Sequence, residues 1–296
     1  MKQAWNIIWK VALAMGAVGI VLTLIGLKLG PPQPVAWGSQ GPRVMDVRDI
    51  EVSENNLAPF DKIVVDAAIL DVTVVQGDRY GLRIHAPSSF LDITWADENG
   101  TLTVTQKDTP IVMGIWFGGP WTVAITVPTG VTLTSASVST HTGDASLAVP
   151  AAAVNLTSST GDVKLLAPAD EAIVRTNTGK ARVETDVKNL TATASTGNVV
   201  VSGNCGAVKA DTSTGQVTIQ GSAINVDAHS STGDVTVTLS APWNATTYSV
   251  HTSTGSIRFA GPGAPPSDNR SSQVASPQLT LTATTSTGSI KVTLGA

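Results

Sequence analysis

The stretch Thr160-Gly161-Asp162-Val163-Lys164-Leu165 decides the fold, because the chain repeats this phrase. Each copy has Thr-Gly, one small, polar or charged residue, and then an apolar-x-apolar triplet. The copies begin at Thr142, Thr160, Thr178, Thr196, Thr214, Thr232, Thr254 and Thr287. The first six glycines are spaced 18 residues apart, and the last two gaps are 22 and 33 residues. A fixed period of this size predicts a solenoid.

Two pairs of apolar positions recur in the regular units. The first pair lies two and four residues after the glycine, as in Val163 and Leu165, and the second lies eleven and thirteen residues after it, as in Ala172 and Val174. Each pair has the two-residue period of a strand with one buried face. The odd separation between the pairs requires a bend, so one unit is two short strands and two bends. Stacked units would pair in parallel at the ~4.8 Å spacing of a sheet.

The corner residues also favour this fold. Glycine suits a tight corner, because φ > 0 costs a residue with a Cβ but costs glycine little. We expect the hydroxyl of the preceding threonine to bond to its own corner or to the next threonine in the stack. Frequent Gly, Val, Thr and Ile argue against helix. The predicted fold class is all-β, a parallel β-solenoid (β-helix) with about 18 residues and two strands per rung.

The amino-terminal segment is different. Residues 11–27 carry no charge, a length near the minimum for crossing a bilayer of about 30 Å. We therefore predict one transmembrane helix over 11–27, with Trp5 and Trp9 at one interface. A cleaved signal peptide is the alternative, but Gly30-Pro31-Pro32 follows the run and no small-x-small cleavage site is evident. A slight lysine bias places residues 1–10 in the cytoplasm and the remainder outside it, at the cell membrane.

Residues 28–43 are rich in Pro, Gly and Gln and predict a linker. Residues 44–140 predict an N-terminal cap, since terminal units must cover an exposed sheet edge, and 141–296 hold the regular Thr-Gly repeats. Within the cap, residues 63–75 look like a degenerate first unit without the glycine. Further strands are expected over 80–86, 91–95, 102–105 after an Asn99-Gly100 turn, and 121–127.

A family resemblance rests on these same residues. The strand Ile125-Thr126-Val127-Pro128, followed by Leu133, Val138 and the ladder of Thr-Gly-Asp-Val units, resembles the bacterial β-strand-repeat domains of unknown function labelled putative adhesins. The resemblance covers about residues 44–296. It implies a module tethered to the envelope by a single membrane segment, in some members linked to envelope-stress or antimicrobial-peptide responses. It brings no catalytic residues.

Candidates for catalysis are few. Asp144 and Asp162 follow successive glycines and would lie ~4.8 Å apart, near enough to couple their titrations or hold a cation. Asp beside Gly is also ordinary turn chemistry. The sequence has no Ser-His-Asp order, phosphate-binding Gly loop or Cys-His ligand cluster. We predict a protein that is not an enzyme and needs no cofactor, with a β-helix glycan lyase or hydrolase as the less favoured alternative.

Three residues could bind a metal. If the insertion between them is a loop, His229 and His251 fall in one outward column, with Asp211 one rung earlier. Two stacked imidazoles and a carboxylate could bind zinc or copper. Surface histidine pairs are more often solvated, so no metal is predicted. The lone Cys205, in a predicted loop over 202–206, excludes an internal disulfide and is expected to be an unpaired thiol.

The binding candidates are aromatic: Trp116, Phe117 and Trp121 in the apolar stretch 111–121, and Trp243. The apolar stretch either touches a membrane, a glycan or a protein or plugs the core. The units after Gly233 and Gly255 gain four and fifteen residues, and such loops are where repeat proteins place recognition. We expect both loops at one edge, with the Trp243 ring free to stack on a partner, unless the insertions are only tolerated.

The sequence thus predicts a membrane-anchored, extracytoplasmic, adhesin-like β-solenoid that binds or scaffolds at the cell envelope, in a setting such as envelope stress. Its partners would be the membrane, a cell-wall glycan or an envelope protein. The net charge of −4 argues against nucleic acid. The alternative is a self-assembling, filament-like solenoid, because the last strand, over 289–294, would leave an open parallel edge that a second copy could extend.

Overall fold

The computed structural model describes residues 35–38, 41–44, 49–54, 57–87, 92–107, 111–113 and 121–295. The chain divides into two compact units, one made of residues 1–48, 87–90 and 109–119 and the other of the rest. In the described ranges there is no helix long and apolar enough to cross a membrane. The predicted membrane helix over 11–27 and the segment 1–10 lie outside these ranges.

The first unit contains a three-stranded antiparallel sheet in the order β2-β1-β9. Its strands are β1 (Val35–Gly38), β2 (Gly41–Val44) and β9 (Ile111–Met113). Val35 pairs with Val44 on one side and with Met113 on the other. Within the predicted linker over 28–43, residues 35–38 and 41–43 lie in two of these strands, and the third comes from the apolar stretch.

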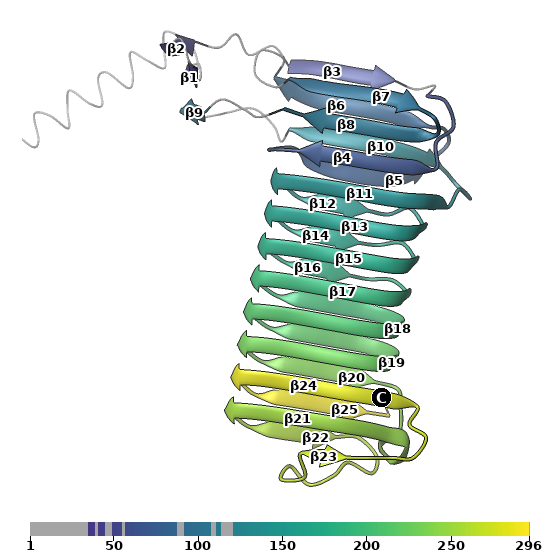
Figure 1. Ribbon diagram of the computed structural model, residues 1–296, viewed down its shortest axis with the longest axis vertical. Coiled ribbons are helices and arrows are strands. Elements are labelled where there is room, and N and C mark those ends of the chain that lie inside the picture. The colour runs from purple at the N-terminus through teal and green to yellow at the C-terminus, as the bar shows by residue number, and fades with distance from the viewer. Residues whose placement is uncertain are drawn as a thin grey trace, which may run out of the picture. The chain divides into compact units, whose positions relative to one another are not determined.

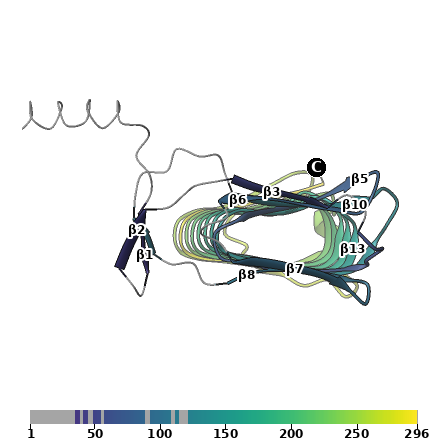
Figure 2. The ribbon, with the colours of Figure 1, turned by 90° about the horizontal axis from the view of Figure 1, so that it is seen from above.

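The second unit is a parallel β-solenoid whose rungs each have a long and a short strand (Figure 1). Figure 2 looks along the stack and shows the rungs superimposed as a flattened ring. The long strands include β11 (Leu133–Thr142), β13 (Ala151–Thr160), β15 (Ala169–Thr178) and β17 (Val187–Thr196). The short strands include β12 (Ala145–Leu147), β14 (Val163–Leu165) and β16 (Ala181–Val183). In β18 (Val199–Thr214) and β19 (Val217–Thr232) a short and a long strand run together.

The 18-residue period of the sequence sets the register of the stack, because paired residues in neighbouring regular rungs are 18 positions apart. Ala172 pairs with Val154 on one side and with Leu190 on the other. The predicted inward columns are buried, and Val163 and Val174 are both 0% exposed. Each inward residue therefore packs on its own counterparts in the neighbouring rungs, which is why the sequence must repeat. The prediction of a β-solenoid with 18 residues per rung is confirmed.

The predicted bend between the two apolar pairs is a corner of two consecutive outward residues. Inward burial alternates from Ala145 to Ala151; Ala152 and Ala153 are then both exposed, and burial resumes at Val154. The same double step occurs in the next two rungs, at residues 170–171 and 188–189. One extra outward residue shifts the strand's alternation by one, so both apolar pairs face the core.

The glycine corner excludes larger residues for two reasons. At Gly197 φ is +140°, and a Cβ there would lie 1.7 Å from the carbonyl oxygen of Gly179 in the adjacent rung. At other corners a hydroxyl three residues before the glycine donates to the glycine carbonyl of the adjacent rung, as when Thr176 donates to the Gly161 carbonyl at 2.9 Å. Thr178, directly before Gly179, is exposed. The expected corner bond of that threonine is thus corrected, because its side chain points outward.

At the N-terminal end, the first rung is made of β4 (Lys62–Ala67) and β5 (Asp71–Gly77). These strands pair in parallel with β11 and β12, with Val72 opposite Ala145. The degenerate first unit over 63–75 is therefore confirmed. Leu70 stands where a regular unit has its corner glycine, and its carbonyl oxygen lies against Gly143.

Beyond this first rung the layers no longer follow chain order. β8 (Thr101–Gln106) and β10 (Thr122–Pro128) pair in parallel with β4 and β5. Outside them, β7 (Ile93–Glu98) and β6 (Gly81–Pro87) pair antiparallel with β8 and β10. β3 (Asp49–Glu54) joins β6. Asn99 and Gly100, with φ of 51° and 71°, make the predicted turn between β7 and β8.

At the C-terminal end the chain again leaves its own order. β20 (Val235–Leu239) completes the rung of β19, and β21 (Thr246–Thr254) with β22 (Ile257–Ala260) forms the outermost rung. The last strands, β24 (Leu279–Thr287) and β25 (Ile290–Leu294), lie between these two rungs. Ala283 pairs with both Ala228 and Val250, and Ile290 pairs with both Val235 and Ile257. Figure 1 shows β24 between β19 and β21.

The prediction of an open last strand over 289–294 is therefore wrong, because β25 is hydrogen-bonded on both sides. The two insertions give the physical reason. The first holds a short 3₁₀ turn (Trp243–Ala245); its four extra residues can span up to about 13 Å, enough to step over one rung of ~4.8 Å. The second, over 261–278, includes β23 (Ser271–Ser272), which pairs antiparallel with β21 before the chain returns.

Candidate functional site

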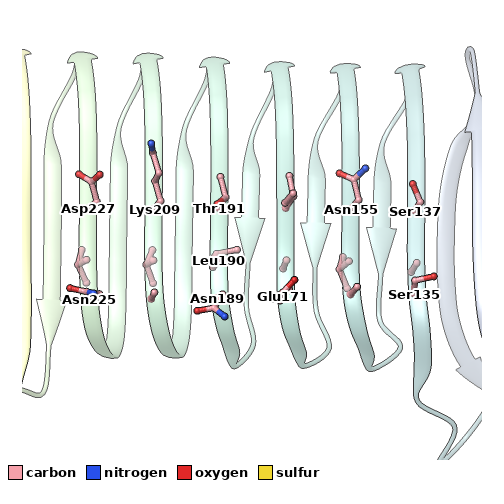
Figure 3. Close-up of a pocket in the computed structure, with 18 of the residues that line it drawn as sticks. Ser135, Ser137, Asn155, Glu171, Asn189, Leu190, Thr191, Lys209, Asn225 and Asp227 are labelled. Carbon is pink, nitrogen blue, oxygen red and sulfur yellow. The ribbon is translucent and has the colours of Figure 1, made fainter.

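A groove of about 760 Å³ runs along the stack on the long-strand face. It crosses β11, β13, β15, β17, β18, β19 and β24. Figure 3 shows lining residues at matching positions on successive strands, such as Asn155, Thr191 and Asp227. Six spacings of ~4.8 Å give it a length of about 29 Å. The groove lies where two consecutive residues face outward, so the corner that closes the core also shapes the outer surface.

Two outward columns form the walls of this groove, and an inward column forms its floor. Neighbours along each wall are in register, as Asn189 is with Glu171. Val154 and Leu190, in the floor, are only 4% and 3% exposed. The first wall carries Ser135, Glu171, Asn189, Asn225 and Thr280, and the second carries Ser137, Asn155, Ile173, Thr191, Lys209 and Asp227.

Three amides are the most distinctive groups of these walls. Asn155, Asn189 and Asn225 are exposed, and none of their side chains hydrogen-bonds to another residue in the described part of the chain. Each amide offers one acceptor oxygen and two N–H donors. The backbone groups of these strands are paired with neighbouring rungs, so this face must recognise a ligand through side chains. A ligand rich in both donors and acceptors fits these walls.

The groove carries little net charge. Glu171 and Asp227 are acidic, and the Lys209 Nζ lies 3.9 Å from Oδ2 of Asp211, just beyond the second wall. Burial raises the pKa of the Asp211 carboxyl, nearby Lys209 lowers it, and Asp227 raises it further. Because the charges are few and of both signs, the surface is not suited to a polyanion or a polycation.

The structure does not bring the three predicted metal ligands together. Asp211 and His229 are paired in adjacent rungs, but Thr284 is paired with both His229 and His251 and separates them. The Thr284 Oγ1 is 2.8 Å from Nδ1 of His229. A search of the described residues finds no group of three His, Cys, Asp or Glu side chains that could hold a metal ion. The expected column of two adjacent histidines is wrong, because the inserted C-terminal rung lies between them.

Asp144 and Asp162 lie in adjacent rungs, as the repeat predicts. Oδ1 of Asp144 accepts the backbone N–H of Asp162 at 2.8 Å, and Oδ1 of Asp162 accepts that of Lys180 at 2.9 Å. Oδ2 of Asp144 lies 4.0 Å from the Lys164 Nζ. These carboxylates link one corner to the next, 18 residues along the chain, and their bonds stabilise the stack.

The aromatic candidates have three different outcomes. Trp116 and Phe117 lie outside the described residues. Trp121, half-buried, immediately precedes β10. Trp243 is only 7% exposed, donates its Nε1–H to the Ala260 carbonyl at 3.0 Å, and packs edge-on against Phe259 with ring centres 5.3 Å apart. The expectation of an exposed Trp243 ring is therefore wrong, because the insertion folds inward and covers the end of the core.

Cys205 also differs from its expected setting. The predicted loop over 202–206 is part of strand β18, and the Cys205 side chain is 7% exposed. Burial raises the pKa of the thiol, while a hydrogen bond with the Val187 backbone lowers it. The thiol therefore stays protonated at neutral pH and is a small core residue.

The groove amides were not singled out from the sequence. Asn189 and Asn225 stand ten residues after a glycine and Asn155 stands twelve after one, on either side of the inward column at eleven. Those positions alternate with the core column, so they could have been assigned to the outer face. The concave shape of that face depends on the corner geometry, which the alternation alone does not give.

Several solved bacterial structures are similar to this chain. A putative adhesin from Bacteroides fragilis is 16% identical over 83% of this chain and 97% of its own, with a TM-score of 0.52. A putative adhesin from Parabacteroides merdae is 13% identical over 84% and 97%, with a TM-score of 0.33. A putative lipid binding protein from Parabacteroides distasonis is 10% identical over 84% and 98%, also with a TM-score of 0.33.

The search of curated proteins finds no match. A family model described as Toastrack DUF4097 matches residues 60–293. The match covers the rungs of the solenoid and both of its irregular ends except β3, and it confirms the resemblance to bacterial β-repeat domains of unknown function. The chain therefore belongs to the Toastrack DUF4097 family.

Proposed function

We propose that this chain is a non-catalytic binding module, held outside the cytoplasm by one N-terminal membrane segment, and that its ligand lies along the long-strand groove. The observation that carries the proposal is the set of exposed wall amides, Asn155, Asn189 and Asn225, which have no protein hydrogen-bond partner among the described residues. The adhesin-like name of the Bacteroides fragilis structure is consistent with a binding role.

The ligand that these walls favour is a linear, uncharged, hydroxyl-rich polymer such as a cell-wall glycan strand. A sugar hydroxyl both donates and accepts, as do the Asn amides and the Ser and Thr hydroxyls of the walls. An extended peptide that adds a strand needs a free sheet edge, and the groove is a sheet face. An amphipathic helix needs apolar anchor pockets, whereas Ile173 is the one large apolar side chain exposed among these wall residues.

The carboxylates of the groove are poorly placed for glycan cleavage. Glycosidases hold two carboxyl groups about 5 to 9.5 Å apart. Glu171 and Asp227 stand three rungs apart and in opposite walls, so the stacking alone separates their backbones by about 14 Å. This separation supports binding without hydrolysis.

The membrane tether rests on the uncharged run over 11–27 and on the resemblance to envelope-tethered domains. A single spanning helix would leave the solenoid free to reach a wall polymer. Protease treatment of intact and of permeabilised cells tests it: the solenoid should be digested in both, with residues 1–10 protected in intact cells. Protection of the solenoid in intact cells would contradict the proposed orientation.

The binding proposal is tested with the full chain in detergent and insoluble, uncharged cell-wall glycan. Replacing Asn155, Asn189 and Asn225 together with alanine should weaken retention at least tenfold, because three wall amides lose their hydrogen bonds. Asn177→Ala is the matched control, an exposed amide on the same face but outside the groove, and should bind like the parent. Equal retention of the triple variant and the parent would rule out the groove as the site.

A further inference from the structure

The C-terminal rung lies between two rungs that come before it in the chain. In the stack, β24 separates β19 from β21, and β25 separates β20 from β22. All other described neighbours from β11 to β19 follow chain order. The chain must therefore form the inner rung, skip one position, form the outermost rung, and only then fill the gap.

The two separated rungs are built so that they could stack on each other directly. Their inward columns match, because Ala228 and Val250 both pair with Ala283 in the rung between them. Their corners match too, since Gly233 and Gly255 have φ of 142° and 149° and both lie against Gly288. Removal of the inserted rung would bring like residues together in each column.

Their polar groups are also interchangeable. The Gly233 carbonyl now accepts from Thr285, and the Gly288 carbonyl accepts from Thr252, both at 2.9 Å. With β24 absent, Thr252 could donate to Gly233 instead. Likewise Oδ1 of Asp234, which accepts the Ser289 backbone N–H at 2.8 Å, could accept that of Ser256. Direct stacking leaves neither acceptor without a donor.

The connections of the inserted pair are long on the side of β22. The segment between β20 and β21 is long enough to step over one rung, and the segment 261–278 joins β22 to β24. We call β24–β25 the tail. After β25, the Gly295 N–H bonds to the Leu239 carbonyl in the rung of β19 and β20.

We propose that β24–β25 enters the solenoid last, into a slot between β19–β20 and β21–β22 that closes by direct stacking whenever the tail is out. The slot is a binding site for an extended segment that carries the chain's own Thr-Gly phrase, and the C-terminal segment is its occupant. Insertion adds a full rung of buried side chains, among them Leu281 and Val292 at 1% and 0% exposed, so the filled slot is the stable state. This proposal does not rest on the proposed function of the groove, although Thr280 of β24 lies in one groove wall.

Cysteine pairs in the full chain distinguish the two states. In the filled state residues 229 and 251 are two rungs apart, roughly 9.6 Å between Cα atoms, which is too far for a disulfide. Direct stacking brings them to ~4.8 Å, within the range that a disulfide allows. The pair His229→Cys with His251→Cys therefore reports the empty slot, and His229→Cys with Thr284→Cys reports the filled slot.

Both pairs are placed in a Cys205→Ala background, since the counterparts of Cys205 in other rungs include Ala169 and Ala223. The full chain is unfolded in urea and refolded in oxidised glutathione, and samples are quenched over time. We expect the 229–251 disulfide to form early and the 229–284 disulfide late. If the 229–284 disulfide forms at all times and the 229–251 disulfide at none, the proposed order of insertion is wrong.

A substitution that prevents β24–β25 from entering the slot provides a second test, made at equilibrium. A Cβ on residue 288 would lie 2.1 Å from the Gly233 carbonyl oxygen, so Gly288→Val should expel the tail. In the 229–251 cysteine background this variant should be cross-linked in most molecules, with trypsin cutting at Lys291. Ser286→Val is the matched control, at an exposed residue of β24 two positions before Gly288, and should behave like the parent. A folded Gly288→Val protein without the 229–251 cross-link would overturn the proposal; should that variant not fold, the refolding series decides.

Discussion

The two ends of the solenoid are both closed out of chain order, but by different means. At the N-terminal end the outer layer pairs antiparallel, and β7 and β8 are sequence neighbours joined by the Asn99-Gly100 turn. At the C-terminal end every rung stays parallel, and closure needs β24–β25 to pair with strands as far as 55 residues away, as His229 does with Thr284. The N-terminal end is closed by antiparallel strands that include one local hairpin, and the C-terminal end is closed by an inserted parallel rung.

The difference shows how a repeat protein can end its stack. An open parallel edge invites pairing with another chain. A hairpin covers an edge at low entropic cost, because its loop is short. Insertion of β24–β25 costs more loop entropy than a hairpin, but it buries a complete rung. The aromatic cluster around Trp243 then covers the outermost rung, β21–β22. We therefore expect the ends to respond separately to damage, and both to depend on the rungs between them.

The largest expected effect is in the middle, on which both ends stack. Gly197→Val places a Cβ 1.7 Å from the Gly179 carbonyl oxygen at a φ of +140°. Backbone strain and overpacking together should lower the free energy of unfolding by about 4 kcal/mol, measured by urea denaturation. Gly130→Val is the control, since φ there is +86° but nothing lies within 4 Å, and it should cost about 1–2 kcal/mol. If both variants lose the same free energy of unfolding, contact between rungs is not the reason that a side chain is excluded at Gly197.

The next effect is confined to the C-terminal end. Trp243→Ala removes a buried ring that contacts Tyr248 and Phe259 and should cost about 3 kcal/mol. Hydrogen exchange should speed up in β21–β25 and stay unchanged in β4–β8. Trp95→Ala, at a 37% exposed ring near the other end, should cost about 1 kcal/mol or less. Faster exchange at both ends in Trp243→Ala would show that the ends are coupled.

A smaller effect is expected at the N-terminal end. Gly100→Val introduces a β-branched residue at a φ of +71°, and the Gly100 carbonyl also accepts the backbone N–H groups of Asp61 and Lys62. The strain should cost about 2 kcal/mol. Hydrogen exchange should rise in β7 and β8 while β24 and β25 keep their protection. Loss of protection at the C-terminal end would contradict separate closure.

The smallest effect is expected between the ends, at Asp211. Burial raises the pKa of this carboxyl, helped by Asp227 and opposed by Lys209 and His229. The folded state thus holds the proton more tightly than the unfolded state. The free energy of unfolding therefore falls as pH rises from the ordinary pKa of 3.8 to the raised pKa of the folded state. At higher pH the loss of stability stays constant. Asp211→Asn should be more stable than the parent at pH 7, within about 0.5 kcal/mol, and equal to it at pH 3. If Asp211→Asn is less stable than the parent at pH 7, the Asp211 carboxylate stabilises the folded state, and the predicted direction is wrong.

Much of the fold could be predicted from the sequence. The 18-residue spacing of glycines gave the rung, and the pairs such as Val163 and Leu165 gave its core, because each residue packs on its own copy. The candidate site was harder. Asn155 and Asn189 can be assigned to the outer face by alternation, but the groove between them exists only because the strand bends at two consecutive outward residues. The prediction of an exposed Trp243 ring failed, because the sequence of an insertion does not show whether its side chains pack against the core or face solvent.

The sequence by itself determined which kinds of residue stack on each other: small apolar side chains in columns, and glycine on glycine at the corners. Only the tertiary structure decided the order of the rungs. The physical reason is the repeat itself, because units with the same columns fit one another equally well, and local pairing rules cannot distinguish a neighbour in the chain from a later copy. That choice depends on loop lengths and on the buried surface gained by closing each end, which are properties of the whole molecule.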